Sequence, residues 1–278
     1  MIEFTKMQGL GNDFIIVDNR KYSLSNEQLS KLAARICTRK ISLGADGLMA
    51  VASGEQSDFK MIFFNGDGSL GEMCGNGARC IVRYAYEKGV ASREMTFETT
   101  AGVVRGVVED KRLVTVGLNL PKVIRLDQNI LVDGRTYLVD YIELGDPGVP
   151  HAMIAIEALD IHNPDYLKSL AKALRFHKSF HKGANINFYH KSYSYVQAVT
   201  YERGVEDFTM ACGTGVASLA VVLSLKKEST SEPIKIQMPG GMLRITIHKQ
   251  KDRIEKLELT GETSMVAEGI ILDEDLNW

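Results

Sequence analysis

The sequence contains one short motif twice. Cys74-Gly75-Asn76-Gly77 and Cys212-Gly213-Thr214-Gly215 each place a cysteine directly before glycine-x-glycine and a run of helical length. The two cysteines are 138 positions apart (212 − 74), close to half of the 278-residue chain. A motif repeated at this distance indicates an internal duplication, which constrains the fold more than any single element does.

The same offset aligns other segments of the two halves. The apolar residues of NEQLSKLAARI (26–36) fall on those of NPDYLKSLAKAL (163–174). Both segments have helical spacing and begin with asparagine, a good N-cap, so we expect an amphipathic helix in each. After the second helix one extra residue shifts the offset to 139. Residues 101–118 then fall on residues 240–259, a copy two residues longer, and alternating apolar positions predict a β-ribbon in each half.

Each half therefore reads as strands, a helix, a strand, the cysteine motif, a second helix and a ribbon. This order predicts an α+β fold of two duplicated domains, residues 1–120 and 121–262. The segment at about 263–278 exceeds the second repeat, and it is available to pack back on the first domain.

Composition excludes several classes of protein. The net charge of −2 gives no electrostatic basis for binding nucleic acid or an anionic membrane surface. The sequence has no signal-peptide pattern and no apolar run near the roughly 20 residues that span a bilayer, so we expect a cytoplasmic protein. Four scattered cysteines without C-x-x-C spacing predict neither a disulfide framework nor a zinc site, and we expect Cys37 and Cys80 to be buried.

The two cysteine motifs have a chemistry of their own. The first N–H groups of a helix lack intrahelical partners, and with the helix dipole they attract anions. A cysteine at this position lies in positive potential, which lowers the pKa of its thiol. One thiolate and one thiol facing the same carbon can remove a proton from one face and return a proton to the other. The pair would invert a stereocentre without a cofactor, while the helix N-termini hold the adjacent carboxylate.

Other interpretations of the motifs remain open on the residues alone. Each motif is compatible with a tight strand-to-helix turn that buries a cysteine. The G-x-G-x-x-G of residues 66–71 is a weak dinucleotide fingerprint without a following βαβ series. One cysteine paired with a histidine would suit a hydrolase, but this leaves the second motif unexplained. A duplicated amino-acid-binding protein with incidental thiols is a further alternative.

Seven ordered motifs resemble those of diaminopimelate epimerases. They are MQGLGNDF (7–14), GADG (44–47), NGDGS (65–69), MCGNG (73–77), PH (150–151), YERG (201–204) and ACGTG (211–215). The resemblance implies an enzyme that interconverts LL- and meso-diaminopimelate for lysine and peptidoglycan synthesis, with no pyridoxal phosphate and no metal. It also implies two pseudosymmetric domains, each a β-barrel-like sheet around a central helix, with the active site in the interdomain cleft of a homodimer subunit.

The resemblance also implies roles for particular residues. Cys74 and Cys212 are the expected acid and base, and His151 and Glu202 are expected to help set their protonation states. The expected substrate contacts are the backbone amides of Gly75, Asn76, Gly213 and Thr214 at the reacting carboxylate, and the side chains of Asn12, Asn65, Asn185 and Arg203, the last three at the distal end. Guanidinium and carboxamide groups suit an amino acid with a second carboxylate.

The sequence departs from the family pattern at three places. Val149 stands where many members have an asparagine that binds the distal end of the substrate, and valine cannot form a hydrogen bond. Residues 205–210 and the junction at 118–123 also differ from the common patterns. These departures concern the identity of the substrate more than the reaction, so lanthionine or histidine is kept as an alternative substrate.

Overall fold

The computed structural model describes residues 1–71, 74–229, 232–251, 253–272 and 274. Glu72 and Met73 of the first cysteine motif, and residues 273 and 275–278 of the C-terminal segment, lie outside the described residues. The chain forms two compact units. The first comprises Met1–Gly117 and the segment from Gly261 onward, and the second comprises Leu118–Thr260.

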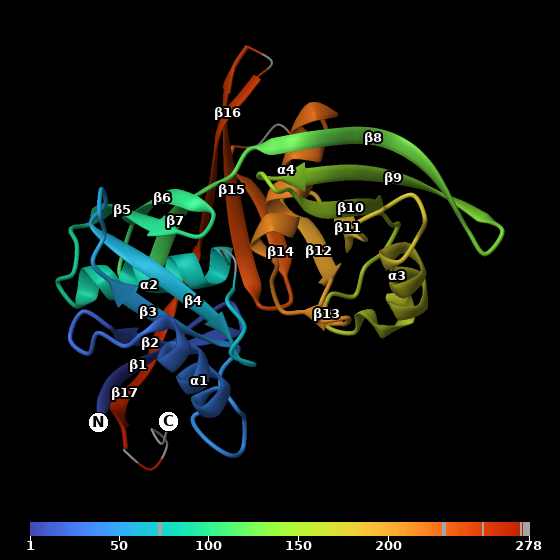
Figure 1. Cartoon of the computed structure of the whole chain (residues 1–278). Helices are drawn as coiled ribbons and strands as arrows, with labels where there is room; N and C mark the ends of the chain where they lie inside the picture. Colours follow the sequence, from blue (N-terminus) through green and yellow to red (C-terminus); the bar gives the residue numbers. More distant parts are fainter. Residues whose placement is uncertain (72–73, 230–231, 252, 273, 275–278) are drawn as a thin grey trace. The chain divides into compact units, whose positions relative to one another are not determined.

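The first unit is a run of paired strands around one helix (Figure 1). The strands pair in the order β17, β1, β2, β3, β4, β5, β6, β7, and the β2–β3 and β4–β5 pairs are parallel. Their bounds are β1 Ile2–Gly9, β2 Asn12–Asp18, β3 Gly47–Ala52, β4 Phe59–Asn65, β5 Glu94–Thr99, β6 Gly102–Val108, β7 Leu113–Leu118 and β17 Ser264–Ile271.

The second unit repeats this plan. Its strands pair in the order β8, β9, β10, β11, β12, β14, β15, with β10–β11 and β12–β14 parallel, and the short β13 also pairs with β12. Their bounds are β8 Pro121–Val132, β9 Arg135–Leu144, β10 Val149–Ala155, β11 Asn185–Lys191, β12 Val196–Tyr201, β13 Phe208–Thr209, β14 Ile234–Met238, β15 Gly241–Gln250 and β16 Arg253–Glu262.

The helices expected from the sequence form, but two of their starts differ from the prediction. Helix α1 (Asn26–Ile36) is capped by Ser25, whose side chain forms a capping box with Gln28, so Asn26 is not the N-cap. In the second unit Asn163 precedes a 3₁₀ turn, η1 (Pro164–Leu167), and its side chain forms no cap; α3 (Lys168–Arg175) follows. At the start of α1, Ser25 and Gln28 together form a capping box, so the N-cap lies one residue before Asn26. At the start of η1, Pro164 favours the tight 3₁₀ turn.

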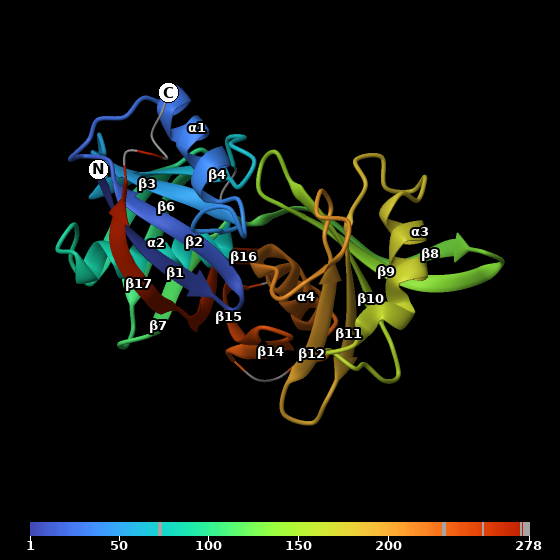
Figure 2. The same cartoon turned by 90° about the horizontal axis from the view of Figure 1, so that it is seen from below.

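One buried helix lies at the centre of each unit. Helix α2 (Gly75–Glu87) is buried along its first eleven residues and packs against β1, β2 and β6. Helix α4 (Gly213–Leu225) is apolar on all sides, as a helix enclosed by strands must be, and packs against β9, β10, β11 and β15. Figures 1 and 2 show each helix among the strands of its own unit.

The predicted α+β duplication is confirmed by the equivalent order of elements. Shifting α2 by 138 residues gives the bounds of α4, and shifting β3 by the same amount gives the start of β11. In both units a parallel pair precedes the central helix and an antiparallel pair follows it. The duplication therefore brings the two cysteine motifs to the same place in the two sheets.

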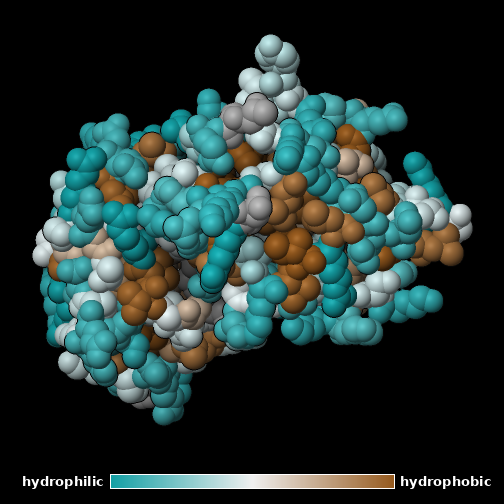
Figure 3. All heavy atoms as spheres, turned by 90° about the horizontal axis from the view of Figure 1, so that it is seen from above, coloured by the Kyte–Doolittle hydropathy of each residue, from teal (hydrophilic) through white to brown (hydrophobic). Residues whose placement is uncertain are grey.

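The surface carries no continuous apolar band in the view of Figure 3, where hydrophilic side chains surround several separate hydrophobic patches. Scattered exposed apolar side chains of this kind are normal. Among the described residues, no helix is long and apolar enough to cross a membrane.

Candidate active site

Each cysteine motif begins a central helix. Cys74 is the N-cap of α2, with φ −105° and ψ 121°, and Cys212 is the N-cap of α4, with φ −120° and ψ 105°. Neither cysteine side chain caps its helix by a hydrogen bond. The first-turn N–H groups and the helix dipole place each cysteine in positive potential. The prediction that a helix follows each motif is confirmed.

The second glycine of each motif lets the central helix approach its sheet. A Cβ atom on Gly215 would lie 2.5 Å from Asn187 Oδ1 and 3.2 Å from Cys212 Sγ. On Gly77 it would lie 3.2 Å from Met49 Sδ. These glycines therefore serve packing against the strands, in addition to the access for a ligand that the motif suggested.

Three predicted residues meet at the first motif. The Cys74 thiol lies 3.5 Å from Asn12 Oδ1, and Asn76 Nδ2 lies 3.5 Å from the same oxygen. Asn12 is held in turn by Asp46, whose Oδ2 accepts from Asn12 Nδ2 at 2.5 Å. Because Asn12 begins β2 and Cys74 is the N-cap of α2, the carboxamide and the thiol come together only through the fold.

Four charged residues form a cluster of ion pairs that includes Asp46, the hydrogen-bond partner of Asn12. Asp13 and Asp46 receive hydrogen bonds or ion pairs from Arg39 Nη2 at 2.5 and 2.9 Å, and Lys6 Nζ lies 3.2 Å from Asp13. Burial opposes ionisation of Asp13, but the hydrogen bonds from Arg39 and Lys6 hold the pKa of its carboxyl below its usual range. The two cations balance the two carboxylates, so the cluster fixes Asn12 without adding net charge.

Thr214 of the second motif lies between His151 and the Cys212 thiol. His151 Nε2 lies 3.0 Å from Thr214 Oγ1, which lies 3.6 Å from Cys212 Sγ. Burial, reinforced by the positive charge of Arg203, lowers the pKa of His151 to about 3. The imidazole is therefore neutral near pH 7, and its link to the thiol runs through the Thr214 hydroxyl.

The other predicted residues of the second unit lie at the ends of neighbouring strands. Asn185 begins β11 opposite His151 of β10, and Asn185 Oδ1 accepts from the Arg203 N–H at 2.8 Å. The guanidinium of Arg203 is exposed and donates from Nη1 to the Lys182 carbonyl at 3.1 Å. Glu202 is half-buried, and its Oε1 accepts from Thr209 Oγ1 at 2.5 Å.

Asn65 lies on an exposed turn of the first unit. Its Nδ2 donates to Ser69 Oγ at 2.9 Å, in the turn that follows β4. The adjacent Gly66 donates its N–H to the Asp46 carbonyl at 2.9 Å, which links this turn to the residue that holds Asn12. Thus Asn12, Asn76 and Cys74 contact one another, whereas Asn65 is connected to them only through Gly66 and Asp46.

Asn187 is a buried polar residue of the second unit that was not predicted from the sequence. This side chain is 1% exposed and donates to the carbonyls of Ala152 and Asn185, at 3.1 and 3.2 Å. Its Oδ1 accepts from Thr200 Oγ1 at 2.8 Å, and its Nδ2 lies 3.4 Å from His151 Nδ1. The alternation Asn185-Ile186-Asn187 could have indicated this residue, because alternate residues of a strand share one face and Asn185 was already predicted to lie in the site.

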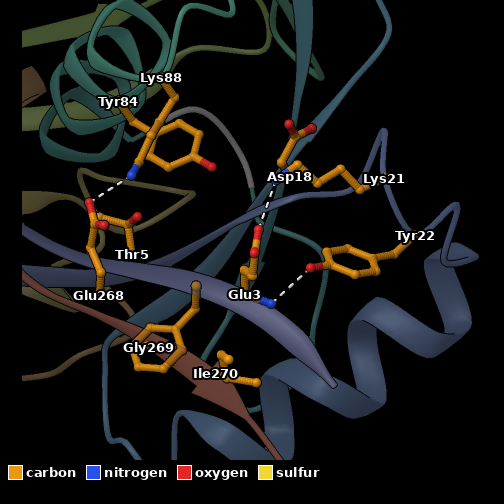
Figure 4. A pocket seen from close by; sticks show the side chains of 11 residues that line it. Glu3, Thr5, Asp18, Lys21, Tyr22, Tyr84, Lys88, Glu268, Gly269 and Ile270 are labelled. Atoms are coloured by element: carbon orange, nitrogen blue, oxygen red, sulfur yellow. Dashed lines mark hydrogen bonds and ion pairs between the residues drawn. The ribbon is translucent and has the colours of Figure 1, made fainter.

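A separate pocket of about 460 Å³ lies in the first unit, lined by β1, β17 and the end of α2 (Figure 4). In it Lys88 Nζ donates to Glu268 Oε1 at 2.7 Å, and the Glu3 N–H donates to the Tyr22 hydroxyl at 2.9 Å. None of the predicted site residues lines this pocket. In the described part of the chain no group of three or more His, Cys, Asp or Glu side chains is arranged to hold a metal ion.

Comparison with known proteins identifies the family. The model of the family described as "Diaminopimelate epimerase" matches residues 4–122 and 145–266. The chain belongs to this family. It is 38% identical to the diaminopimelate epimerase of Aquifex aeolicus over the full length of both chains. It is 36% identical to that of a Hydrogenobaculum species, over 96% of this chain and 97% of the relative. This family member is accordingly an enzyme of the isomerase class.

Solved structures of more distant proteins share the fold. A PhzF-family phenazine biosynthesis protein of Bacillus anthracis has a TM-score of 0.75 at 14% identity, covering 98% of this chain and 99% of the other. A probable proline racemase of Agrobacterium radiobacter K84 has a TM-score of 0.70 at 15% identity, with 98% and 93% covered. At these identities the likeness concerns the two-domain fold, and it agrees with the duplication described above.

Proposed function

We propose that this family member interconverts LL- and meso-diaminopimelate by proton transfer between two cysteines. The observation that carries the proposal is the equivalence of Cys74 and Cys212, each the N-cap of a buried central helix. Cys74 removes the α-proton on one face and Cys212 delivers a proton to the other, and the roles exchange in the reverse direction. The product has the inverted configuration, and the enzyme recovers its one thiol and one thiolate in exchanged positions.

The helix N-termini stabilise the carbanion that forms between the two steps. Negative charge spreads from the α-carbon onto the substrate carboxylate, which would accept from the amides of Gly75, Asn76, Gly213 and Thr214. Asn12 beside Cys74, and Thr214 between His151 and Cys212, would orient the thiols. The neutral state of His151 supports this role, because it can accept or donate a hydrogen bond without adding charge.

The distal end of the substrate would bind Arg203, Asn185 and Asn65. Arg203 supplies an exposed guanidinium, and a charge-assisted contact contributes about 1.5–3 kcal/mol. Val149 is the one observation that favours a second candidate, the same chemistry on another amino acid. The cytoplasmic location and the homodimer implied by the family resemblance remain predictions.

Incubation with LL-diaminopimelate in deuterated water tests the proposal. We expect meso-diaminopimelate that carries one deuterium at the inverted carbon, detected by chiral chromatography with mass spectrometry. Lysine, which lacks the distal carboxylate, should react little or not at all. Faster turnover of histidine or lanthionine than of diaminopimelate would favour the second candidate.

A further inference from the structure

The first central helix holds a buried arginine, Arg79, for which the described residues supply no carboxylate partner. Arg79 is 0% exposed, and its Nε atom has no hydrogen-bond acceptor among the described residues. In the described part of the chain no Asp or Glu pairs with it, whereas Arg83, one turn later, lies 3.5 Å from Glu87. A buried, uncompensated cation is costly, so its retention at this position calls for a function.

The guanidinium of Arg79 is fixed against the first turn of α2. Nη1 donates to the Gly75 carbonyl at 3.1 Å, and Nη2 donates to Asn76 Oδ1 at 2.9 Å. Because Oδ1 of Asn76 is engaged, its Nδ2 is directed to Asn12 Oδ1, the oxygen beside the Cys74 thiol. The arginine thus orients both carboxamides at the first cysteine and adds its charge to that of the helix N-terminus.

The equivalent position of the second central helix holds no cation. Position 217, which corresponds to 79 under the offset of 138, is a buried alanine. Among the described residues, the predicted site of the second unit has the neutral His151, the carboxyl of Glu202 and the exposed Arg203. Around the first motif, the charges of Lys6, Asp13, Arg39 and Asp46 balance, and the Cys80 thiol stays protonated because burial raises its pKa to about 12.

We infer that Arg79 is a positioning residue that makes Cys74, rather than Cys212, the thiolate of the resting enzyme. The duplicated fold gives both cysteines the same helix N-terminus, and Arg79 breaks that equivalence. Burial lowers the pKa of Arg79 to about 10, so the guanidinium still carries its charge at pH 7. The inference rests on the proposed two-thiol reaction for its significance, but thiol ionisation can be measured without turnover.

The test follows alkylation of the full chain by iodoacetamide from pH 5 to pH 10, with peptide mapping of Cys74 and Cys212. The midpoint of each rate profile reports the thiol pKa and does not depend on how accessible the thiol is. We expect a lower midpoint for Cys74 than for Cys212 in the unaltered protein. Arg79→Gln should raise the Cys74 midpoint by about one unit, a tenfold decrease in the acid dissociation constant of the thiol, and leave the Cys212 midpoint unchanged.

Two further variants separate charge from folding. Arg79→Lys should retain most of the low Cys74 midpoint, because it keeps the cation but loses the planar fork. Arg83→Gln is the matched control on the same helix, where the arginine donates to the Thr263 carbonyl at 2.8 Å, and it should leave both midpoints unchanged. The inference is overturned if Cys212 ionises first in the unaltered protein, or if Arg79→Gln leaves the Cys74 midpoint in place. If the unaltered protein shows the expected midpoints but does not epimerise diaminopimelate, the proposed function is contradicted instead.

Discussion

Cys74 and Cys212 hold the same structural position 138 residues apart, each with an extended backbone at the N-cap of a 13-residue central helix. Their side-chain neighbours differ. Asn12 lies beside the first thiol, and Thr214, backed by His151, lies beside the second. The backbone is therefore equivalent at the two helix N-termini, while the neighbouring side chains distinguish the two cysteines.

Replacing either of these cysteines by alanine should remove activity in both directions. We expect a fall in kcat of about 10²–10⁴-fold for Cys74→Ala and for Cys212→Ala, because each thiol serves one face of the carbon. Cys37→Ala is the control, since burial raises the pKa of this thiol to about 12 and keeps it out of the reaction. Near-normal epimerisation by Cys74→Ala in the deuterium assay would show that the two-thiol mechanism is wrong.

A methyl group on Gly215 should disturb the second half-site. Its Cβ would lie 2.5 Å from Asn187 Oδ1 and 3.2 Å from Thr200 Oγ1, so Gly215→Ala should lower the free energy of unfolding by about 1–3 kcal/mol and reduce kcat. Gly77→Ala should cost less, because its nearest contact is the flexible Met49 side chain at 3.2 Å. Gly117→Ala, with its nearest atom at 3.7 Å, is the control. Urea denaturation measures the differences, and equal costs for Gly215 and Gly117 would contradict this account.

His151 should make the protein less stable in mild acid. Its pKa is about 3 in the folded chain and about 6.5 when unfolded, so below pH 6.5 the unfolded chain binds more protons than the folded one. The stability from this group is complete above pH 6.5, and we expect about 2 kcal/mol to be lost between pH 7 and pH 5. The measurement is urea denaturation at both pH values for the unaltered protein and for His151→Gln.

The His151→Gln variant should lose less stability than the unaltered protein over this interval. His181→Gln removes an exposed histidine and should keep the full loss. If the two variants show the same dependence on pH, the imidazole of His151 is not the group that titrates.

Substrate preference should depend on Arg203 more than on Val149. Arg203→Ala removes the exposed guanidinium, and a charge-assisted contact of about 1.5–3 kcal/mol corresponds to a loss of about 10–150-fold in kcat/KM for diaminopimelate. Val149→Asn adds at most a neutral hydrogen bond of about 0.5–1.5 kcal/mol, so its effect should be smaller. Arg135→Ala, on the β8–β9 hairpin, is the charge control and should have little effect. A larger change in kcat/KM with Val149→Asn than with Arg203→Ala would show that position 149, and not Arg203, determines the substrate preference.

The sequence by itself determined the duplication and most of its elements. The repeated C-G-x-G motif and an offset of 138, then 139, residues were sufficient to predict two α+β units with a helix after each cysteine, because residues of one repeat experience the same local interactions in both copies. The alternation of apolar residues likewise predicted the ribbons β6–β7 and β15–β16. Burial of Cys37 and Cys80 also followed from composition.

Only the tertiary structure decided how side chains distant in the sequence meet. Asn12 and Cys74 are 62 residues apart, and His151 and Thr214 are 63 apart, yet each pair lies within 3.5 Å. Neither the buried position of Arg79 nor the contacts of Asn187 were predicted from the sequence. Both depend on burial and on neighbouring atoms, which only the tertiary structure shows. Periodicity fixes which face of a strand or helix a side chain occupies, but the packing of helices on sheets fixes which side chain it touches and how its charge is compensated.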